Sequence, residues 1–380
     1  MDPKTNQRIS TLTNQKPRRI IISGGGTGGH IYPAIAIADA LRAEDPATEI
    51  LFVGAEGKME MEKVPKAGYR IVGLPIVGIK RALTLDNAAF PVKLTRSLLR
   101  ARSVLRDFRP DVAVGVGGFA SGPMLMVASL LGVPTLIQEQ NSHAGITNKL
   151  LARRAKTICV AYPNMEKFFD PKKIKFLGNP VRRDIIDSGS KRAEALAHLG
   201  FDGKRKTLFV MGGSLGARSI NESIEAGLEQ FSNAGYQVLW QTGKAYIDTA
   251  RGAVAHTASE RIKAFDFIYE MDLAYAAADV VVSRAGALSV SELCLAAKPC
   301  ILVPYPAASE DHQTKNATNL TRQNAALLVA DNRAASELVD EAMRLLEDES
   351  KQKELQQNIA KLARPNAAAE IAREVLKLVG

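Results

Sequence analysis

Two glycine-rich segments are the first features of the sequence that suggest chemistry. One spans residues 24–30 (GGGTGGH) and the other spans residues 212–216 (GGSLG). Each follows a short apolar run typical of a buried strand and precedes a helical stretch. Glycine lets the backbone approach a phosphate closely, and the start of the following helix supplies N–H groups and positive potential. The pair therefore indicates a reaction between two phosphate-bearing substrates.

Neither segment by itself identifies a ligand. Gly24, Gly26 and Gly29 match the dinucleotide fingerprint, but a tight turn with no ligand fits the same letters. A nicotinamide site also needs an acid at the end of the second strand, and Glu56 comes late for that position. His30 stands where an ATP-binding loop needs lysine. The sequence thus argues against an NAD(P)-dependent oxidoreductase and against an ATP site.

Apolar strands that alternate with helical stretches must position these loops, and this alternation predicts parallel, doubly wound sheets. Strands are expected at 19–23, 50–53, 112–116, 135–138, 207–211, 238–241, 280–283 and 300–303. A helix follows each glycine segment, at 33–43 and 217–231. Two strand–loop–helix openings lie about one domain apart, which predicts an α/β protein with two Rossmann-like domains.

The domain boundaries follow from breaks in the apolar pattern. Of the 380 residues, 1–18 form a polar start expected to be disordered, and 19–180 form the first domain. The second domain is expected at 183–364, after a Pro-, Gly- and charge-rich linker near 178–190. A last helix, at 366–380, is expected to pack back on the first domain.

The composition narrows the class of protein. With 46% hydrophobic and 24% charged residues, the chain can bury ordinary cores. Its three cysteines lack metal or disulfide spacing, which fits a reducing compartment. No signal peptide is expected, and the longest apolar region, 124–137, is too short to span a membrane. The net charge of +10 favours polyanionic partners, although a generally solvated basic surface also fits.

Residues 76–109 combine apolar and basic side chains. The apolar ones are Ile76, Ile79, Leu83, Leu85, Phe90, Leu94, Leu98 and Leu99, and the basic ones are Lys80, Arg81, Lys93, Arg96, Arg100, Arg102, Arg106 and Arg109. This combination predicts peripheral binding to an anionic membrane surface. The alternative is a core helix with a solvated basic face. A nucleic-acid surface is disfavoured, because only Phe90 and Phe108 are available for stacking.

Further motifs occur in both halves of the chain. They are GGGTGGHIYP (24–33), VGGFASGP (116–123), QEQNSHAGITNK (138–149), GNPVR (178–182), GGSLGAR (212–218), SRAGALSVSE (283–292) and EDHQTKNA (310–317). In this order, from about Arg19 to the C-terminus, the sequence resembles the MurG family of N-acetylglucosaminyltransferases. The resemblance implies a GT-B fold, with two Rossmann-like parallel-sheet domains facing a central cleft. It also implies that the acceptor binds the first domain and UDP-N-acetylglucosamine mainly the second.

The resemblance further implies an inverting transfer in peptidoglycan synthesis. N-acetylglucosamine would pass from UDP-N-acetylglucosamine to the 4-hydroxyl of an undecaprenyl-diphosphate-linked muramyl peptide (lipid I), which gives lipid II. The enzyme would be peripheral, on the cytoplasmic side of the plasma (inner) membrane. Other cell-wall synthesis proteins are implied partners. The resemblance implies no cofactor, no catalytic metal and no nucleic-acid partner. The alternative within the fold is another UDP-sugar enzyme, such as an epimerase or a glycolipid transferase.

The family's site residues are carried over by resemblance. The donor contacts would be Thr27, Gly28, Gly29, Asn141, Arg182, Ser214, Ile268, Ala287, Leu288, Ser289, Val290, Ser291, Glu292 and Gln313. His30 is the candidate base, because a helix start disfavours a charged imidazole ring. Glu139 is the rival base, or instead orients the acceptor. Alternatively, His30 only hydrogen-bonds its own loop or the acceptor.

The chemistry of several donor contacts suits these roles. Glu292 can accept hydrogen bonds from two ribose hydroxyls, and Arg182 can offset diphosphate charge. Taken singly, each also fits an ordinary surface or loop position. Two positions depart from the family pattern. Phe119 stands where tyrosine is common, and Gln138 stands where histidine is common, so a hydroxyl contact and a proton carrier are absent there.

Overall fold

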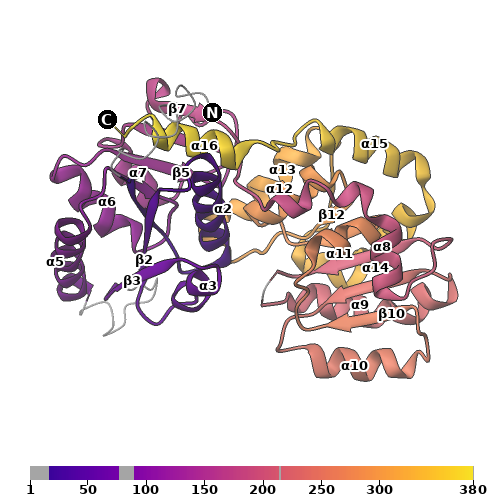
Figure 1. Cartoon of the computed structure of the whole chain (residues 1–380). Helices are drawn as coiled ribbons and strands as arrows, with labels where there is room; N and C mark the ends of the chain where they lie inside the picture. The colour runs from indigo at the N-terminus through magenta and orange to yellow at the C-terminus, as the bar shows by residue number, and fades with distance from the viewer. Residues whose placement is uncertain (1–16, 77–89, 214, 380) are drawn as a thin grey trace, which may run out of the picture. The chain divides into compact units, whose positions relative to one another are not determined.

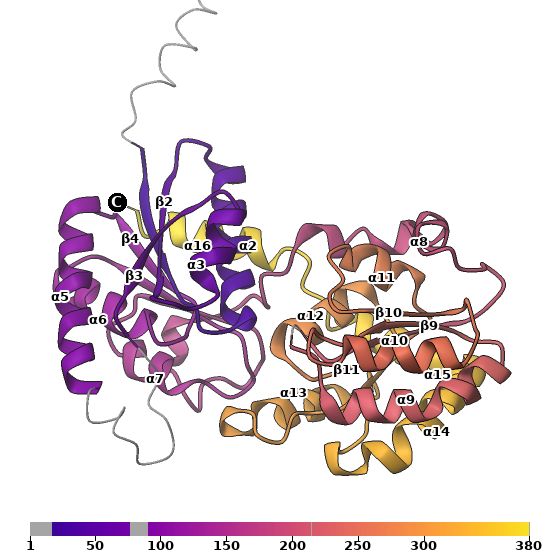
Figure 2. The ribbon, with the colours of Figure 1, turned by 90° about the horizontal axis from the view of Figure 1, so that it is seen from below.

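The computed structural model describes residues 17–76, 90–213 and 215–379. Contacts divide the described residues into two compact units. The first comprises those within Met1–Gln138, Thr147–Ile158 and Ala369–Gly380. The second comprises Glu139–Ile146 and Cys159–Ala368 (Figures 1 and 2). Most of the N-terminal segment expected to be disordered lies outside the described residues.

The first sheet has seven strands in the order β3-β2-β1-β4-β5-β6-β7. Their bounds are β1 (Arg19–Ser23), β2 (Glu49–Ala55), β3 (Arg70–Leu74), β4 (Val112–Gly115), β5 (Thr135–Glu139), β6 (Thr157–Val160) and β7 (Ile174–Phe176). Strand β1 pairs in parallel with both β2 and β4. Its side chains Ile20, Ile21 and Ile22 are fully buried, as expected of a parallel strand covered on both faces.

Helices cover both faces of this sheet. In Figures 1 and 2, α2 and α3 lie on one side and α5 and α6 on the other. The helices are α2 (Gly28–Glu44), α3 (Glu60–Lys66), α5 (Phe90–Phe108), α6 (Ser121–Leu130), α7 (Ile146–Ala152) and α16 (Ala367–Leu376). Arg373 of α16 pairs with Glu44 at the end of α2, at 3.0 Å, so the last helix contacts the first unit.

The second sheet has six strands in the order β10-β9-β8-β11-β12-β13. Its strands are β8 (Thr207–Met211), β9 (Gln237–Gln241), β10 (Ile262–Phe265), β11 (Val280–Ser283), β12 (Cys300–Leu302) and β13 (Leu327–Leu328). Its helices are α8 (Arg192–Leu199), α9 (Arg218–Asn233), α10 (Ile247–His256), α11 (Met271–Ala277), α12 (Ala287–Ala296), α13 (His312–Thr321), α14 (Ala334–Glu347) and α15 (Glu349–Ala360). Short 3₁₀ turns are η1 (Pro171–Lys173), η2 (Arg183–Ile185), η3 (Ser188–Ser190), η4 (Ser309–Asp311) and η5 (Asp331–Arg333).

The core of the second unit lies on both faces of its sheet. Phe209 and Tyr275 pack edge to face in one apolar cluster, and Trp240 and Phe231 lie fully buried in the other. The expectation of two Rossmann-like parallel-sheet domains is therefore confirmed. The three cysteines, Cys159, Cys294 and Cys300, are buried and are not joined in disulfides, and burial raises the pKa of the Cys294 thiol to about 12.

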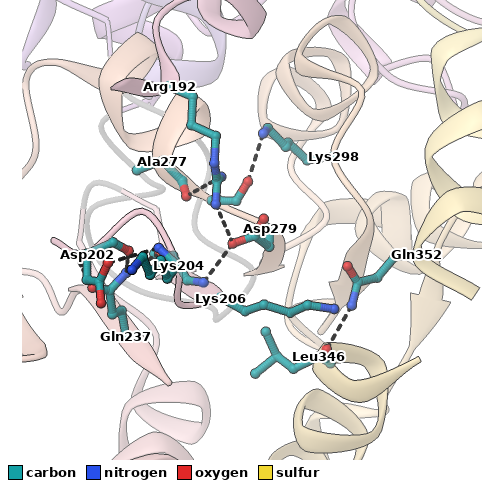
Figure 3. Close-up of polar contacts among 12 residues, drawn as sticks. Arg192, Asp202, Lys204, Lys206, Gln237, Ala277, Asp279, Lys298, Leu346 and Gln352 are labelled. Atoms are coloured by element: carbon teal, nitrogen blue, oxygen red, sulfur yellow. Dashed lines mark hydrogen bonds and ion pairs between the residues drawn. The ribbon is translucent and has the colours of Figure 1, made fainter. Parts of the chain in front are cut away.

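A polar cluster joins the amino ends of the central strands of the second sheet (Figure 3). Asp279, just before β11, accepts hydrogen bonds from Arg192 at 3.0 Å and from the backbone of Thr207 at 2.8 Å. Lys298 donates to the carbonyl of Ala278 at 2.7 Å, and burial lowers its pKa to about 8. These contacts fix β8 beside β11 and leave the opposite, carboxyl edge of the sheet to carry a site.

Candidate active site

The second glycine loop follows β8, which lies between β9 and β11 in its sheet. This is the point at which the strand order reverses, where doubly wound sheets bind ligands. Gly213 and Gly216 have φ angles of +87° and +79°. A Cβ atom at Gly216 would lie 2.0 Å from the carbonyl oxygen of Thr242, so this position requires glycine. Ser214, a predicted donor contact, lies outside the described residues.

Gln241 connects this loop to another predicted donor contact. It ends β9 with its side chain almost fully buried. Its Nε2 donates to the carbonyl of Gly213 at 3.2 Å, and its Oε1 accepts from the backbone N–H of Ile268 at 2.9 Å. The N–H of Ile268 is thus used within the protein. Its carbonyl is left as the group that can face a nucleobase. Gln241 was not predicted, although a polar residue that ends a buried strand is a recognisable signal.

The predicted run from Ala287 to Glu292 forms the first turns of α12, which directly follows β11. Its first backbone N–H groups therefore lie at the same sheet edge as the second glycine loop, and a helix start of this kind attracts anions. Ser291 is used within the protein, because its hydroxyl donates to the carbonyl of Ala287 at 3.0 Å.

Glu292 is held by a buried tyrosine. Its Oε2 accepts from the hydroxyl of Tyr275 at 3.0 Å, and Tyr275 is fully buried. Desolvation raises the pKa of Glu292, against the opposing effects of the charge of Arg182 and of the Tyr275 hydrogen bond. Among the described residues, no donor reaches Oε1 of Glu292, so this oxygen can receive a ligand hydroxyl. Tyr275 was not predicted, because an apolar helix gives no sign that its hydroxyl faces a carboxylate.

Two other predicted donor contacts already have protein partners. The Nε of Arg182 lies 3.9 Å from Asp184, at a partly exposed position that leaves most of the guanidinium able to meet a phosphate. The Oε1 of Gln313 accepts from the backbone N–H of Tyr305 at 2.9 Å. This bond orients the Gln313 amide, so that its NH₂ group is the part left for a sugar.

Glu139 organises a loop rather than standing exposed as a base. Only 2% of its surface is accessible. Its Oε1 accepts from the backbone of Asn141 and its Oε2 from that of Gly145, both at 3.0 Å. A carboxylate with both oxygens bound to backbone N–H groups is poorly placed to take a proton from a substrate. In this geometry Glu139 holds its own loop, which argues against it as the base.

Two buried asparagines hold the same loop within the second unit. Asn316 accepts from the hydroxyl of Ser142 at 3.0 Å and donates to the side chain of Asn141 at 3.4 Å. Asn179 donates to the carbonyl of Gln140 and to the hydroxyl of Ser291, both at 3.0 Å. The predicted contact Asn141 is thus positioned by Glu139 and Asn316, and the loop is tied to the start of α12.

The first glycine loop carries the candidate base. Thr27 is the N-cap residue of α2, and Gly28 and Gly29 form the start of that helix. The Thr27 hydroxyl lies 3.2 Å from Nδ1 of His30, which is partly exposed. The threonine thus orients the imidazole ring. The structure places these residues together in the first unit, beside the loop that carries Phe119.

Part of the predicted membrane segment is described. Helix α5 buries Ser97, Ala101, Val104 and Leu105. Leu99 is 64% exposed and Val92 62%, and Leu130 at the end of α6 is 60% exposed. Residues 77–89, which include Ile79, Lys80, Arg81, Leu83 and Leu85, lie outside the described residues. Within the described ranges, no helix has the length and apolarity needed to cross a membrane.

Comparison with known families defines the class of protein. Residues 20–160 match the N-terminal domain of glycosyltransferase family 28, and residues 207–374 match the C-terminal domain of that family. The chain belongs to glycosyltransferase family 28.

Individual relatives are more specific. The chain is 55% identical over 368 residues to the UDP-N-acetylglucosamine–N-acetylmuramyl-(pentapeptide) pyrophosphoryl-undecaprenol N-acetylglucosamine transferase of Cytophaga hutchinsonii. This match covers 97% of the chain and 99% of that protein. The chain is also 53% identical to the enzyme of the same name from Parabacteroides distasonis, over 95% of the chain and 98% of that protein.

Solved structures agree on the fold. The crystal structure of MurG from Acinetobacter baumannii matches with a TM-score of 0.77 at 29% identity, over 95% of this chain and 100% of that one. A UDP-N-acetylglucosamine 2-epimerase matches with a TM-score of 0.64 at 13% identity, over 95% of this chain and 96% of that one. At that identity, the second likeness concerns the fold alone.

Proposed function

We propose that this chain transfers N-acetylglucosamine from UDP-N-acetylglucosamine to an undecaprenyl-diphosphate-linked N-acetylmuramyl peptide, which makes lipid II for peptidoglycan. The observation that carries the proposal is identity above one half with transferases of this name, over nearly the whole of both chains. The arrangement in the second unit supports it, because a glycine loop and a helix start share one sheet edge.

The donor is assigned to the carboxyl edge of the second sheet. The backbone N–H groups of the second glycine loop and of the start of α12 bind the diphosphate, with Arg182 adding charge. The Oε1 of Glu292 accepts from a ribose hydroxyl, and the carbonyl of Ile268 faces the uracil. Gln313 donates to the sugar. Each assignment uses the group that remains available after the internal hydrogen bonds described above.

The chemical step is a single displacement with inversion. His30 takes the proton of the muramyl 4-hydroxyl, whose oxygen bonds to the anomeric carbon while the bond from that carbon to the diphosphate oxygen breaks. UDP leaves with the added negative charge, which backbone N–H groups aimed at the diphosphate stabilise. The hydrogen bond between Thr27 and His30 supports this role, because it fixes the ring direction before the acceptor arrives.

Membrane binding is the finer part of the proposal. The lipid-linked acceptor stays in the bilayer, and the exposed apolar and basic side chains of α5 suit a peripheral contact with anionic lipid on the cytoplasmic face. Co-sedimentation with liposomes tests this. We expect binding to vesicles with anionic lipid that weakens with salt. Failure to bind such vesicles at low salt contradicts it.

The decisive assay measures transfer of radiolabelled sugar from UDP-N-acetylglucosamine to a short-chain polyprenyl-diphosphoryl muramyl peptide. We expect a labelled disaccharide lipid and release of UDP. Conversion of UDP-N-acetylglucosamine to an epimer without transfer favours the epimerase alternative. Binding of a nicotinamide nucleotide without binding of UDP favours the oxidoreductase alternative.

A further inference from the structure

A buried glutamate lies beneath the first glycine loop. Glu60 is the first residue of α3, and only 1% of its surface is accessible. A buried carboxylate is costly unless hydrogen bonds satisfy it. Its Oε2 accepts from the backbone N–H of Gly26 at 2.9 Å, and its Oε1 accepts from the backbone N–H of Ala55 at 2.9 Å. The side chain therefore joins the loop after β1 to the end of β2.

The surrounding backbone is shaped to fit this carboxylate. A Cβ atom at Gly25, where φ is +149°, would lie 2.1 Å from Oε1 of Glu60. A Cβ atom at Gly54 would lie 2.5 Å from Cγ of Glu60. On the other side, a Cβ atom at Gly118 would lie 2.2 Å from the carbonyl oxygen of Gly25. The loop is thus packed between Glu60 and the segment after β4, and glycine is required at each contact.

The position of this carboxylate changes what the loop can bind. In a dinucleotide-binding fold, the backbone N–H groups of such a loop face a phosphate. Here the N–H of Gly26 faces a carboxylate within the protein. A negative charge held against the loop disfavours a second anion and favours an uncharged group such as a sugar hydroxyl. The next residue along the chain, Thr27, caps α2 and orients His30.

We propose that Glu60 is a positioning residue for the transfer reaction. Through Gly26, it holds residues 24–30 in the conformation that presents Thr27 and His30, and it makes the first glycine loop a site for the acceptor hydroxyl rather than for a diphosphate. This inference rests on the proposed function, because it concerns the placement of the base. Glu60 itself does not exchange a proton with the substrate.

The test compares two glutamates of one helix. Glu60 is buried, whereas Glu62 is exposed and pairs with Lys66 at 2.7 Å, so E62Q is the matched control for E60Q. Glutamine has the size of glutamate but offers one acceptor oxygen, so one of the two backbone N–H groups meets an NH₂ group. We expect kcat of E60Q to fall about 10- to 100-fold, as for a slightly misplaced catalytic group. The Kd for UDP should change by less than about twofold. This corresponds to a free-energy difference well below that of a tenfold change in Kd.

Hydrogen exchange provides a readout that does not depend on activity. Peptides that cover residues 24–30 should exchange faster in E60Q than in the parent chain and in E62Q. The exchange rate of peptides near residue 216 should be the same in all three proteins. If the parent chain transfers no sugar, the proposed function fails. The hydrogen-exchange comparison still tests whether Glu60 holds residues 24–30 in place. If E60Q yields no folded protein, E60D replaces it, since aspartate keeps the charge but is too short to reach both N–H groups.

The outcomes separate a positioning role from a merely stabilising one. A lower Tm with unchanged kcat and KM below that temperature overturns the proposal. So does unchanged exchange over residues 24–30. Loss of UDP affinity equal to the loss of kcat also overturns it, because the first loop would then hold the donor diphosphate.

Discussion

The two glycine loops look alike in sequence but are held by opposite kinds of group. The first is bound from beneath by the carboxylate of Glu60. The second is held by the neutral amide of Gln241, which donates to Gly213, and by close packing of Gly216 on Thr242. In the part of the chain that the structure describes, no carboxylate accepts a hydrogen bond from the second loop. The same glycine spacing thus supports a site that disfavours anions in one unit and one that attracts them in the other.

The largest expected effect separates the loops by function. H30A should lower kcat by about 100- to 10,000-fold, since it removes general-base catalysis. The Kd for UDP, measured by calorimetry, should stay within about twofold of the value for the parent chain. This corresponds to a free-energy difference well below that of a tenfold change in Kd. H256A, at an exposed position on α10, is the control. Unchanged turnover in H30A removes this residue as the base.

The second expected effect is on nucleotide affinity. G216A forces a side chain against Thr242 at a positive φ angle, which costs about 1–2 kcal/mol in conformation alone. We expect the Kd for UDP to rise at least tenfold, because the loop must move. G252A, in helix α10 with open space around the position, is the matched control. Full UDP affinity in folded G216A contradicts the assignment of the diphosphate to this loop.

A smaller effect should appear at the ribose. E292Q removes a charged acceptor, so UDP should bind about tenfold more weakly, as for loss of a charge-assisted hydrogen bond. Because burial raises the pKa of Glu292, protonation should weaken UDP binding of the parent chain at a higher pH than for an ordinary glutamate. E292Q should lose that pH dependence. Deoxyribose analogues of UDP give the check, since the variant should no longer distinguish them from UDP.

The smallest expected effect concerns the opposite edge of the second sheet. The pKa of Lys298 is about 8 in the folded chain and near 10.5 when unfolded. Between these values the unfolded chain binds more protons, so stability should rise as pH increases through this window. In K298M, the free energy of unfolding should rise less across this window, by a few tenths to about 1 kcal/mol. The expected difference is small because Lys298 is partly exposed. Urea unfolding at pH 7.5 and 9.5 measures it, and an unchanged slope contradicts it.

The fold was predicted well, because parallel strands covered on both faces are continuous apolar runs. The expected strands at 19–23, 207–211 and 280–283 have the observed bounds. Strand β3, in which residues 70–73 are not buried, lacks this signal and was not predicted. Short strands at sheet edges, such as β7 and β13, were not predicted either, because two or three residues carry no period.

The site was predicted only where motifs mark it. Gln241 did carry a local signal, because it is a polar residue at the end of a buried strand. The placement of Tyr275, Asn316 and Glu60 depends on tertiary contacts that no local pattern encodes. Glu60 and Glu62 show why. They lie two residues apart in one charged segment, yet one is buried under a loop and the other is exposed. Only the fold distinguishes them. The donor contacts and domain boundaries carried over by resemblance stay predictions, except that the proposal for Glu60 assigns the first glycine loop, with Thr27, Gly28 and Gly29, to the acceptor.

The buried cysteines have a practical consequence for spectroscopy. Because Cys159, Cys294 and Cys300 are shielded, and burial holds the Cys294 thiol protonated near neutral pH, a maleimide dye should label an introduced surface thiol with little background. Position 99 on α5 is open to such a dye. An environment-sensitive fluorophore on L99C would then show, in real time, whether this helix enters a bilayer during the transfer reaction.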